Sequence, residues 1–270
     1  MNATGRTARI RGLVAEHAAR RGSRVAVLDV CTAAVAALPV HGAGVSAMSP
    51  TTATHPLCST DGVSELLEEL QLTLGEGPCV DAYSRGTAVL TSDLSADSVH
   101  DRWPLFAPAA ELAGASSVFA FPLRLGAISP GVLDLYSRTP CHLDAGQLAD
   151  AMVLADTATL VLLQTPLAGA DATADRLDGS VSAPPEDASS DPSLEDLGGY
   201  RAEIDQATGM LTEQLGVGID EAFVRLRAYA YAQERRLADV ARDVVDRTLR
   251  FTPDAPRRPS PGEEGGENRP

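Results

Sequence analysis

The sequence predicts an α+β domain built around an antiparallel sheet with flanking helices, followed by a small all-helical unit. Between residues 25 and 164, apolar residues follow helical spacing in some segments and form short β-rich runs in others. Two of those runs flank a turn bounded by glycines, which favours a hairpin at the centre of the sheet. From residue 197 to 251 the spacing is helical only.

The strand and helix segments of the first region can be assigned in chain order. Helical spacing over 25–38 ends at Pro39, and short strands are expected at 43–48 and 88–94. Residues 64–74 mix Leu66, Leu67 and other leucines with Glu65, Glu68 and Glu69, which predicts an amphipathic helix that stops at Gly75. A further helix is expected to begin at 102–106, with Trp103 as a core anchor.

The clearest strands are 118–125 and 132–136, and the turn between them spans 126–131. A long helix over 145–164 follows, with Asp144 as its N-cap. Its predicted apolar stripe consists of Leu148, Met152, Ala155, Thr159 and Leu162.

The second region contains three helical stripes. They are Ile204, Ala207, Leu211 and Leu215; then Ile219, Ala222, Phe223, Leu226 and Ala230; then Leu237, Val240, Ala241, Val244, Val245 and Leu249. A unit of about 55 residues is near the lower limit for an independent core. We therefore expect a homodimer that forms through the first of these helices, over 200–215.

Composition excludes several classes of protein. The chain has 270 residues, of which 44% are hydrophobic and 22% charged, as in soluble globular proteins. The longest uncharged run, 30–60, is interrupted by Pro39, Pro50 and Pro56, so we expect no membrane span. No apolar core of signal-peptide length follows the N-terminal arginines, and a cytoplasmic location is expected.

The distribution of charge marks the domain boundaries. The net charge is −15, and residues 166–196 carry one Arg against eight acids with no aromatic residue. Such a segment is expected to be a disordered acidic linker. The predicted organisation is a sensor-like domain at 1–165, the linker at 166–196, a helical domain at 197–251 and a disordered tail at 252–270.

The possible reactive sites are few. Cys79, in the turn Gly75-Glu-Gly-Pro-Cys79, is a weak candidate for a ligand-binding or redox thiol, and a small buried thiol in a tight turn is the favoured interpretation. The pairs His55/Cys58 and Cys141/His142 lack the spacing of known zinc sites, so no metal is expected. No nucleophile motif, phosphate-binding loop or carboxylate pair is recognisable, which favours a protein that is not an enzyme and has no cofactor.

The arginines of the second region are the candidate nucleic-acid contacts. Arg225, Tyr229 and Arg236 are expected to lie near one another around the second helix and its exit, together with Arg235. Cations beside stackable rings suit RNA loops. The alternative is a solvated face with ion pairs, which is the favoured interpretation for the third helix, where Asp239 and Arg242 have helical pair spacing.

Two segments resemble a known family. Residues 64–163, which contain LLEELQLTLGEGPCVDA and PGVLDLYSR, resemble the GAF sensor domain of actinobacterial regulators, and residues 200–251 resemble the ANTAR domain that follows it there. The resemblance implies a sensor of an unidentified small molecule or protein, and a three-helix unit that binds RNA stem-loops in nascent transcripts to cause antitermination. The residues that match recurring ANTAR positions are Ala207, Gly209, Ala222, Leu226, Arg227, Ala230, Val240 and Ala241. Of these, the resemblance implies that Arg227 alone contacts RNA.

Two other functions remain open at this point. A helix-turn-helix that binds duplex DNA needs base-reading side chains at the start of its recognition helix, and the third helix starts with Leu237-Ala-Asp-Val. A protein-interaction module of a signalling pathway is compatible with the charge balance.

Overall fold

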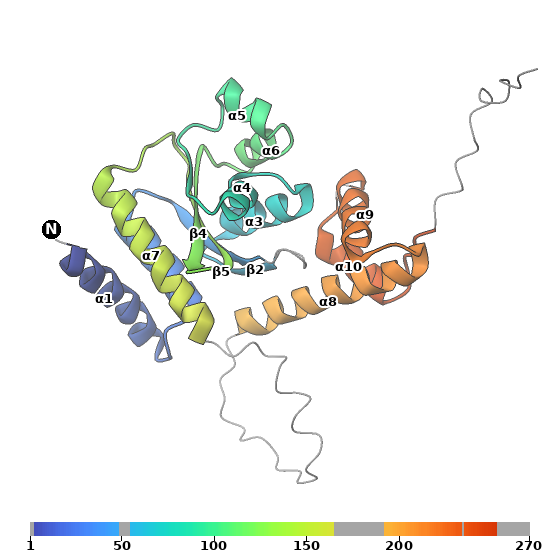
Figure 1. The fold of residues 1–270 in the computed structure, drawn as a ribbon, viewed down its shortest axis with the longest axis horizontal. Helices are drawn as coiled ribbons and strands as arrows, with labels where there is room; N and C mark the ends of the chain where they lie inside the picture. The colour runs from blue at the N-terminus through green and yellow to red at the C-terminus, as the bar shows by residue number, and fades with distance from the viewer. Residues whose placement is uncertain (1–2, 49–54, 165–191, 234, 253–270) are drawn as a thin grey trace, which may run out of the picture.

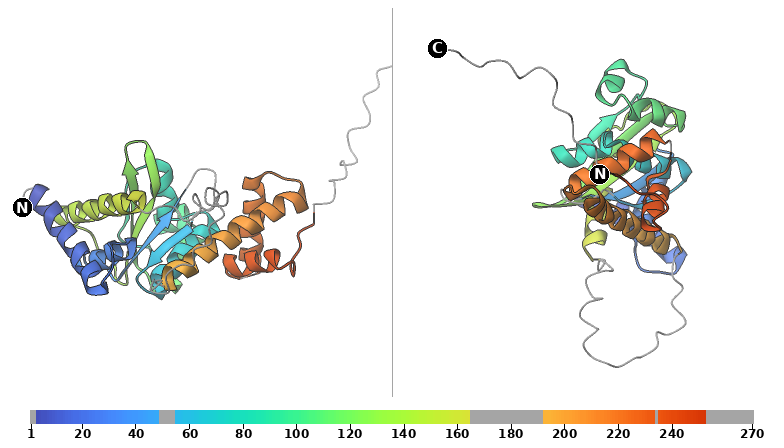
Figure 2. Two further views of the ribbon diagram at one scale, coloured as in Figure 1. Left: turned by 90° about the horizontal axis from the view of Figure 1, so that it is seen from below. Right: turned by 90° about the vertical axis from the view of Figure 1, so that its right-hand side faces the viewer.

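The computed structural model describes residues 3–48, 55–164, 192–233 and 235–252 (Figure 1). A sheet-containing unit occupies the N-terminal part, and three helices form a second unit at the opposite end of the molecule from helix α1, Ala3–Arg21 (Figure 2). The predicted combination of an α+β domain with an all-helical unit is confirmed.

The first unit is built on one five-stranded antiparallel sheet in the order β2-β1-β5-β4-β3. The predicted strands at 43–48, 88–94, 118–125 and 132–136 are all present, and β2 was not predicted. Their bounds are Gly42–Ala47 for β1, His55–Ser59 for β2, Val89–Thr91 for β3, Ser117–Leu125 for β4 and Ile128–Ser137 for β5.

The β4–β5 hairpin is tighter than predicted. Leu125 pairs with Ile128, so the connection consists of Gly126 and Ala127 rather than six residues. Gly126 has a φ of 63°, which only glycine adopts without steric cost. Because this glycine closes the turn early, residues 128–131 extend the strand.

Helices cover both faces of the sheet. Side chains alternate along β4, so that Phe119 and Phe121 face α1, α2 (Val27–Ala37) and α7 (Ala145–Gln164). Val118 and Ala120 face the opposite layer, which contains α3 (Gly62–Leu74), α4 (Pro78–Arg85), α5 (Asp97–Arg102) and α6 (Phe106–Leu112).

Trp103 is 2% exposed and packs in this second layer, which confirms it as a core anchor. The predicted helix begins at the last residue of that segment, Phe106, as α6, while a further helix, α5, ends at Arg102. Trp103 and Pro104 separate the two helices, and the turn lets the indole pack edge-on against Phe106.

Helix α7 has the predicted bounds and the predicted cap, since the Gln147 backbone N–H donates to Asp144 Oδ1 over 2.8 Å. Of the predicted stripe, Ala155 and Thr159 are buried and Leu148 and Leu162 pack against the core, but Met152 was wrongly included, because it is 57% exposed. In length and apolar composition α7 could cross a membrane. In the structure its buried residues pack with α1, α2 and the sheet, as expected of a core helix.

Three helices form the C-terminal unit: α8 (Pro192–Leu215), α9 (Ile219–Ala232) and α10 (Leu237–Val245). Helix α8 begins inside the predicted linker, so residues 192–196 are helical rather than part of it. The remainder of the predicted linker and nearly all of the predicted tail lie outside the described residues.

The stripe of α8 that was predicted to form a dimer is buried within its own unit. Ile204, Ala207 and Leu211 are 0% exposed and pack with α9 and α10. A unit this small needs the whole stripe for its own core. The prediction that these side chains contact a second copy was therefore wrong.

Candidate functional site

The predicted RNA-binding side chains fall into two groups, and the first remains at the surface of the three-helix unit. Arg225 Nη2 lies 2.8 Å from Glu221 Oε1, one turn earlier on α9. Arg235 Nη1, just before α10, lies 2.8 Å from Asp243 Oδ2, and the Arg235 and Asp243 side chains are each more than one third exposed. Ion pairs at the surface contribute little stability, so each arginine readily exchanges its carboxylate partner for another anion.

Arg227 belongs to the second group, because its side chain points at the N-terminal unit. Its Nε donates to the Thr73 carbonyl oxygen over 3.0 Å, and the guanidinium lies 5.5 Å from the centre of the Phe223 ring. Burial lowers the pKa of Arg227. Gly75 makes room for this contact, because a Cβ at that position would overlap Arg227 Nη2.

Arg236 also contacts the N-terminal unit. Its Nε donates to Glu69 Oε2 and its Nη2 to Glu65 Oε1, each over 2.8 Å. The two acids are one turn apart on α3, and they raise the pKa of Arg236. One guanidinium thus bridges two carboxylates of the other unit.

An apolar contact joins the two units at the same place. Leu72, on α3, is 2% exposed and belongs to the hydrophobic core formed by α8, α9 and α10. We call Glu65, Glu69, Leu72, Thr73, Arg227 and Arg236 the α3 clasp.

Tyr229, predicted as a stacking ring, is partly exposed on α9. Its ring lies 5.1 Å from that of Phe251 and packs against the core of the unit. Tyr231 is 51% exposed on the same helix as Val224, which is 57% exposed. The helical spacing of Val224, Ala228 and Tyr231, outside the buried stripe, was the signal that could have identified this outer face.

A second candidate site lies inside the N-terminal unit, between α3, α4 and the sheet. Asp134 is at the middle of β5, paired with Gly44 of β1, and is 5% exposed. Glu68 of α3 is 2% exposed and lies directly over Gly44, where a Cβ would come within 2.5 Å of Glu68 Oε1. Ser46 Oγ donates a short hydrogen bond to Glu68 Oε2.

Burial of Glu68 contradicts the expectation for α3. The sequence places Leu66 on the apolar side and the glutamates on the polar side, but Leu66 is 42% exposed. The helix is instead turned so that Ser64, Leu67, Glu68 and Gln71 face the cavity.

Cys79 joins the two acids. It is fully buried near the start of α4, and its backbone N–H donates to Gln71 Oε1 over 2.7 Å. One potential ligand atom from each of Glu68, Cys79 and Asp134 lies within 4.8 Å of the other two. Cys79 is a small buried thiol after a tight turn, as the favoured interpretation predicted, and burial raises its pKa, which disfavours the reactive thiolate. Contact of Cys79 with a ligand stays a prediction.

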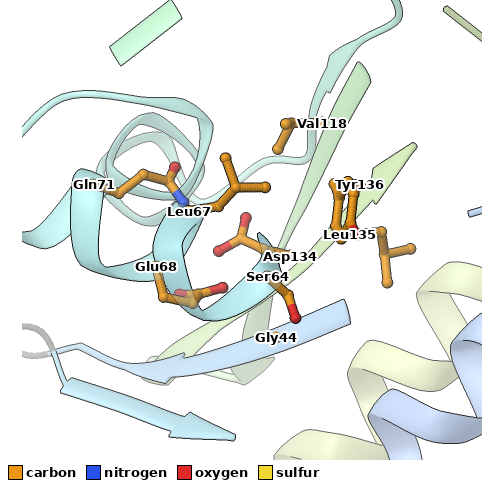
Figure 3. A pocket seen from close by; sticks show the side chains of 9 residues that line it. All are labelled: Gly44, Ser64, Leu67, Glu68, Gln71, Val118, Asp134, Leu135 and Tyr136. Atoms are coloured by element: carbon orange, nitrogen blue, oxygen red, sulfur yellow. The ribbon is translucent and has the colours of Figure 1, made fainter. Parts of the chain in front are cut away.

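The electrostatics of this cluster follow from burial. Desolvation raises the pKa of Glu68 well above its usual range and raises that of Asp134 to about 7. Figure 3 shows the carboxyl groups of Glu68 and Asp134 and the amide of Gln71 turned toward one space. The residues that could hold a cation are therefore Glu68, Cys79 and Asp134.

The comparisons with known proteins concern the two units separately. Residues 199–245 match the family described as ANTAR domain. Among curated protein sequences, none matches the chain.

Several solved structures resemble the N-terminal unit at low identity. The GAF domain of the Acinetobacter phosphoenolpyruvate-protein phosphotransferase is 16% identical, covers 60% of this chain and 94% of its own, and has a TM-score of 0.45. The corresponding GAF domain from Coxiella burnetii is 12% identical, covers 60% and 95%, and has a TM-score of 0.43. The free methionine-R-sulfoxide reductase from Neisseria meningitidis, in complex with its substrate, is 15% identical, covers 58% and 90%, and has a TM-score of 0.39.

Proposed function

With an ANTAR domain at residues 199–245 as the premise, we propose that this protein is a signal-responsive RNA-binding regulator of transcription antitermination and not an enzyme. The ANTAR match over the three-helix unit is the observation that carries the proposal. Arg235 supplies an exposed cation, Tyr231 an exposed ring and Arg225 a partly exposed cation on that unit, as single-stranded RNA loops require.

The α3 clasp supplies the regulation. Arg227 and Arg236 are cations of the RNA-binding unit, and in this structure both are engaged by α3 of the N-terminal unit. An RNA phosphate and the Glu65 and Glu69 carboxylates compete for the same guanidinium. RNA binding therefore strengthens when the clasp opens.

The clasp is weak enough to act as a switch. The Arg236 and Glu65 side chains are 53% and 57% exposed, and an ion pair this exposed contributes at most about 1 kcal/mol. The Glu69 side chain is only 10% exposed, so its pair with Arg236 is less screened by solvent. The apolar component includes the burial of Leu72, which is worth about 2 kcal/mol. A signal that moves α3 needs only a few kcal/mol to shift this equilibrium.

The N-terminal unit is the proposed sensor, of the GAF type. Its antiparallel sheet, its helical layers on both faces and the resemblance of residues 64–163 to GAF domains support this role. The signal we propose is a small ligand or a protein that acts on the side of the sheet covered by α3 and α4.

The test is a binding titration of the full-length protein with a pool of RNA hairpin pairs that have randomised loops, and with duplex DNA of the same length. We expect saturable binding to RNA that weakens with salt, and weaker binding to DNA. Arg227→Ala and the Arg235→Ala, Arg236→Ala pair should lower affinity and reduce the salt slope. Arg20→Ala, on α1, is the matched control, since Arg20 pairs only locally with Glu16. Equal affinity for both nucleic acids, or no binding, would overturn the proposal.

We also propose that the protein is a homodimer in the cytoplasm, because two copies would bind two RNA hairpins at once. Sedimentation at low and high salt tests it. A monomer at every concentration and ionic strength would remove the dimer and leave RNA binding to be judged separately.

A further inference from the structure

The buried cluster of Glu68, Cys79 and Asp134 has an unmet requirement for a positive charge or a hydrogen-bond donor. By hydrogen-bond geometry, neither carboxylate oxygen of Asp134 has a partner among the described residues, and neither does Gln71 Nε2, although the side chains of Cys79, Glu68 and Gln71 lie close enough to Asp134 to oppose the rise of its pKa. Buried carboxylates are almost always hydrogen-bonded or paired with a cation, because an unpartnered one costs several kcal/mol. A proton, a water molecule or a cation can meet this requirement.

The size of the cavity restricts the occupant. Its volume is about 10 Å³, which is room for roughly one water molecule or one ion. Its lining includes Leu67, Val118 and Tyr136, with Cys79 beside it rather than in the lining, and Tyr136 is held by its hydroxyl, which donates to Asp61 Oδ2 over 2.6 Å. An organic molecule does not fit the cavity in this conformation.

The ligand atoms favour one class of ion. One thiol and two carboxylates form a borderline-soft donor set, which suits Zn²⁺ and other first-row divalent transition metals. Ca²⁺ requires six to eight oxygen ligands and Mg²⁺ an octahedral oxygen shell, and the cluster supplies neither. Around a tetrahedral Zn²⁺ the ligand atoms lie about 3.5 Å apart, so the observed spread of up to 4.8 Å needs only a small contraction.

We propose that Glu68, Cys79 and Asp134 bind one divalent transition-metal ion, with Zn²⁺ as the best fit. The ion replaces the protons on the Cys79 thiol and on the carboxyl groups, which leave to solvent. Ser46 orients Glu68 through its hydroxyl, and Gln71 lies beside Asp134, where its amide can donate to a carboxylate oxygen that does not bind the ion. Three protein ligands leave a fourth position for water or a small molecule.

Helix α3 connects the ion to the α3 clasp, because it carries residues of both sites; this step rests on the proposed function. Glu68 faces the ion from one side of α3, while Glu65, Glu69 and Leu72 face α9 and α10 from the other. Metal binding itself does not depend on RNA binding.

The test is a calorimetric titration of metal-free, reduced, full-length protein with Zn²⁺, together with Co²⁺ as a spectroscopic probe. We expect one ion per chain and a near-ultraviolet Co²⁺–thiolate absorption band. Cys79→Ser and Asp134→Asn should each weaken binding at least tenfold, and Cys79→Ser should also abolish the band. Matched controls are Cys141→Ser, a thiol outside the cluster, and Asp93→Asn, an exposed carboxylate that accepts hydrogen bonds from Ser95.

Absence of binding, or affinities unchanged in both cluster variants, would overturn the proposal. A Co²⁺–thiolate band that persists in Cys79→Ser would assign the thiolate elsewhere, for instance to Cys31 and Cys58, whose sulfur atoms lie 2.9 Å apart. If Cys79→Ser fails to fold, Asp134→Asn still decides the question, since it leaves every thiol in place. No RNA enters the experiment, so its failure leaves the proposed RNA binding untouched.

Discussion

Glu68 and Glu69 are consecutive residues of α3 that serve different units: Glu68 lies over Gly44 in the buried cavity, and Glu69 accepts a hydrogen bond from Arg236. Helix α3 therefore contacts both the buried cavity of the N-terminal unit and the three-helix unit. A change in the position of α3 that accommodates a ligand at Glu68 also moves the carboxylate at Glu69. Under the proposed function, this connection is a short physical route from signal to RNA.

Loss of the Glu69 charge should open the α3 clasp. We expect Glu69→Gln to bind RNA about fivefold more tightly than the wild type, because roughly 1 kcal/mol of competition for Arg236 disappears. Glu213→Gln is the control, since it removes the same charge from an exposed position on α8. Equal gains in the two variants would indicate a general charge effect and contradict the clasp.

Gly75 and Gly126 offer a matched pair of backbone substitutions. Both have positive φ, 69° and 63°, so Gly75→Ala and Gly126→Ala should each lose about 1–2 kcal/mol of stability. Only the alanine methyl group introduced at position 75 would collide with Arg227, because nothing lies within 4 Å of a Cβ at Gly126. We expect faster tryptic cleavage after Arg227 and tighter RNA binding in Gly75→Ala alone. Similar cleavage in both variants would contradict the assigned role of Gly75.

Tyr231 and Tyr229 should respond differently to truncation. Tyr231→Ala removes an exposed ring, so RNA affinity should fall about tenfold with little change in melting temperature. Tyr229→Ala loses the contact with Phe251 and should lower the melting temperature. Thermal melts and RNA titrations of both variants check this, and an RNA affinity unaffected by Tyr231→Ala would remove that ring from the interface.

Asp134→Asn should stabilise the metal-free protein. The amide is nearly isosteric with the carboxylate and carries no charge, so burying it without partners costs less, by about 1–3 kcal/mol. Saturating Zn²⁺ should raise the melting temperature of the wild type and leave that of Asp134→Asn unchanged. Destabilisation of the metal-free variant would show that Asp134 has a structural partner in solution.

The sequence predicted the elements whose signals are local. The bounds of α7 follow from the Asp144 cap and a long apolar run, and the end of α3 follows from Gly75. Helix α1 was missed because its buried residues, Ile10, Val14 and Ala18, form a thin stripe among arginines and alanines. Such a thin stripe can be recognised as a buried helix face only once α2 and α7 are seen to pack against it.

The candidate sites could be predicted only in part, for a related reason. Arg227 and Arg236 stay predicted RNA contacts, but their partners in the structure lie on α3, more than 150 positions earlier in the chain. No helical spacing reports a contact at that separation. The metal-ligand cluster likewise combines α3, α4 and β5, so no short motif contains Glu68, Cys79 and Asp134 together.

Hydrogen–deuterium exchange of the full-length protein, with and without a hairpin-pair RNA selected from the randomised pool, tests the central claim most directly. If RNA displaces α3 from Arg227 and Arg236, amides over residues 65–73 should exchange faster in the complex, while those of α9 become protected. Unchanged or slower exchange over 65–73 in the RNA complex would contradict the account.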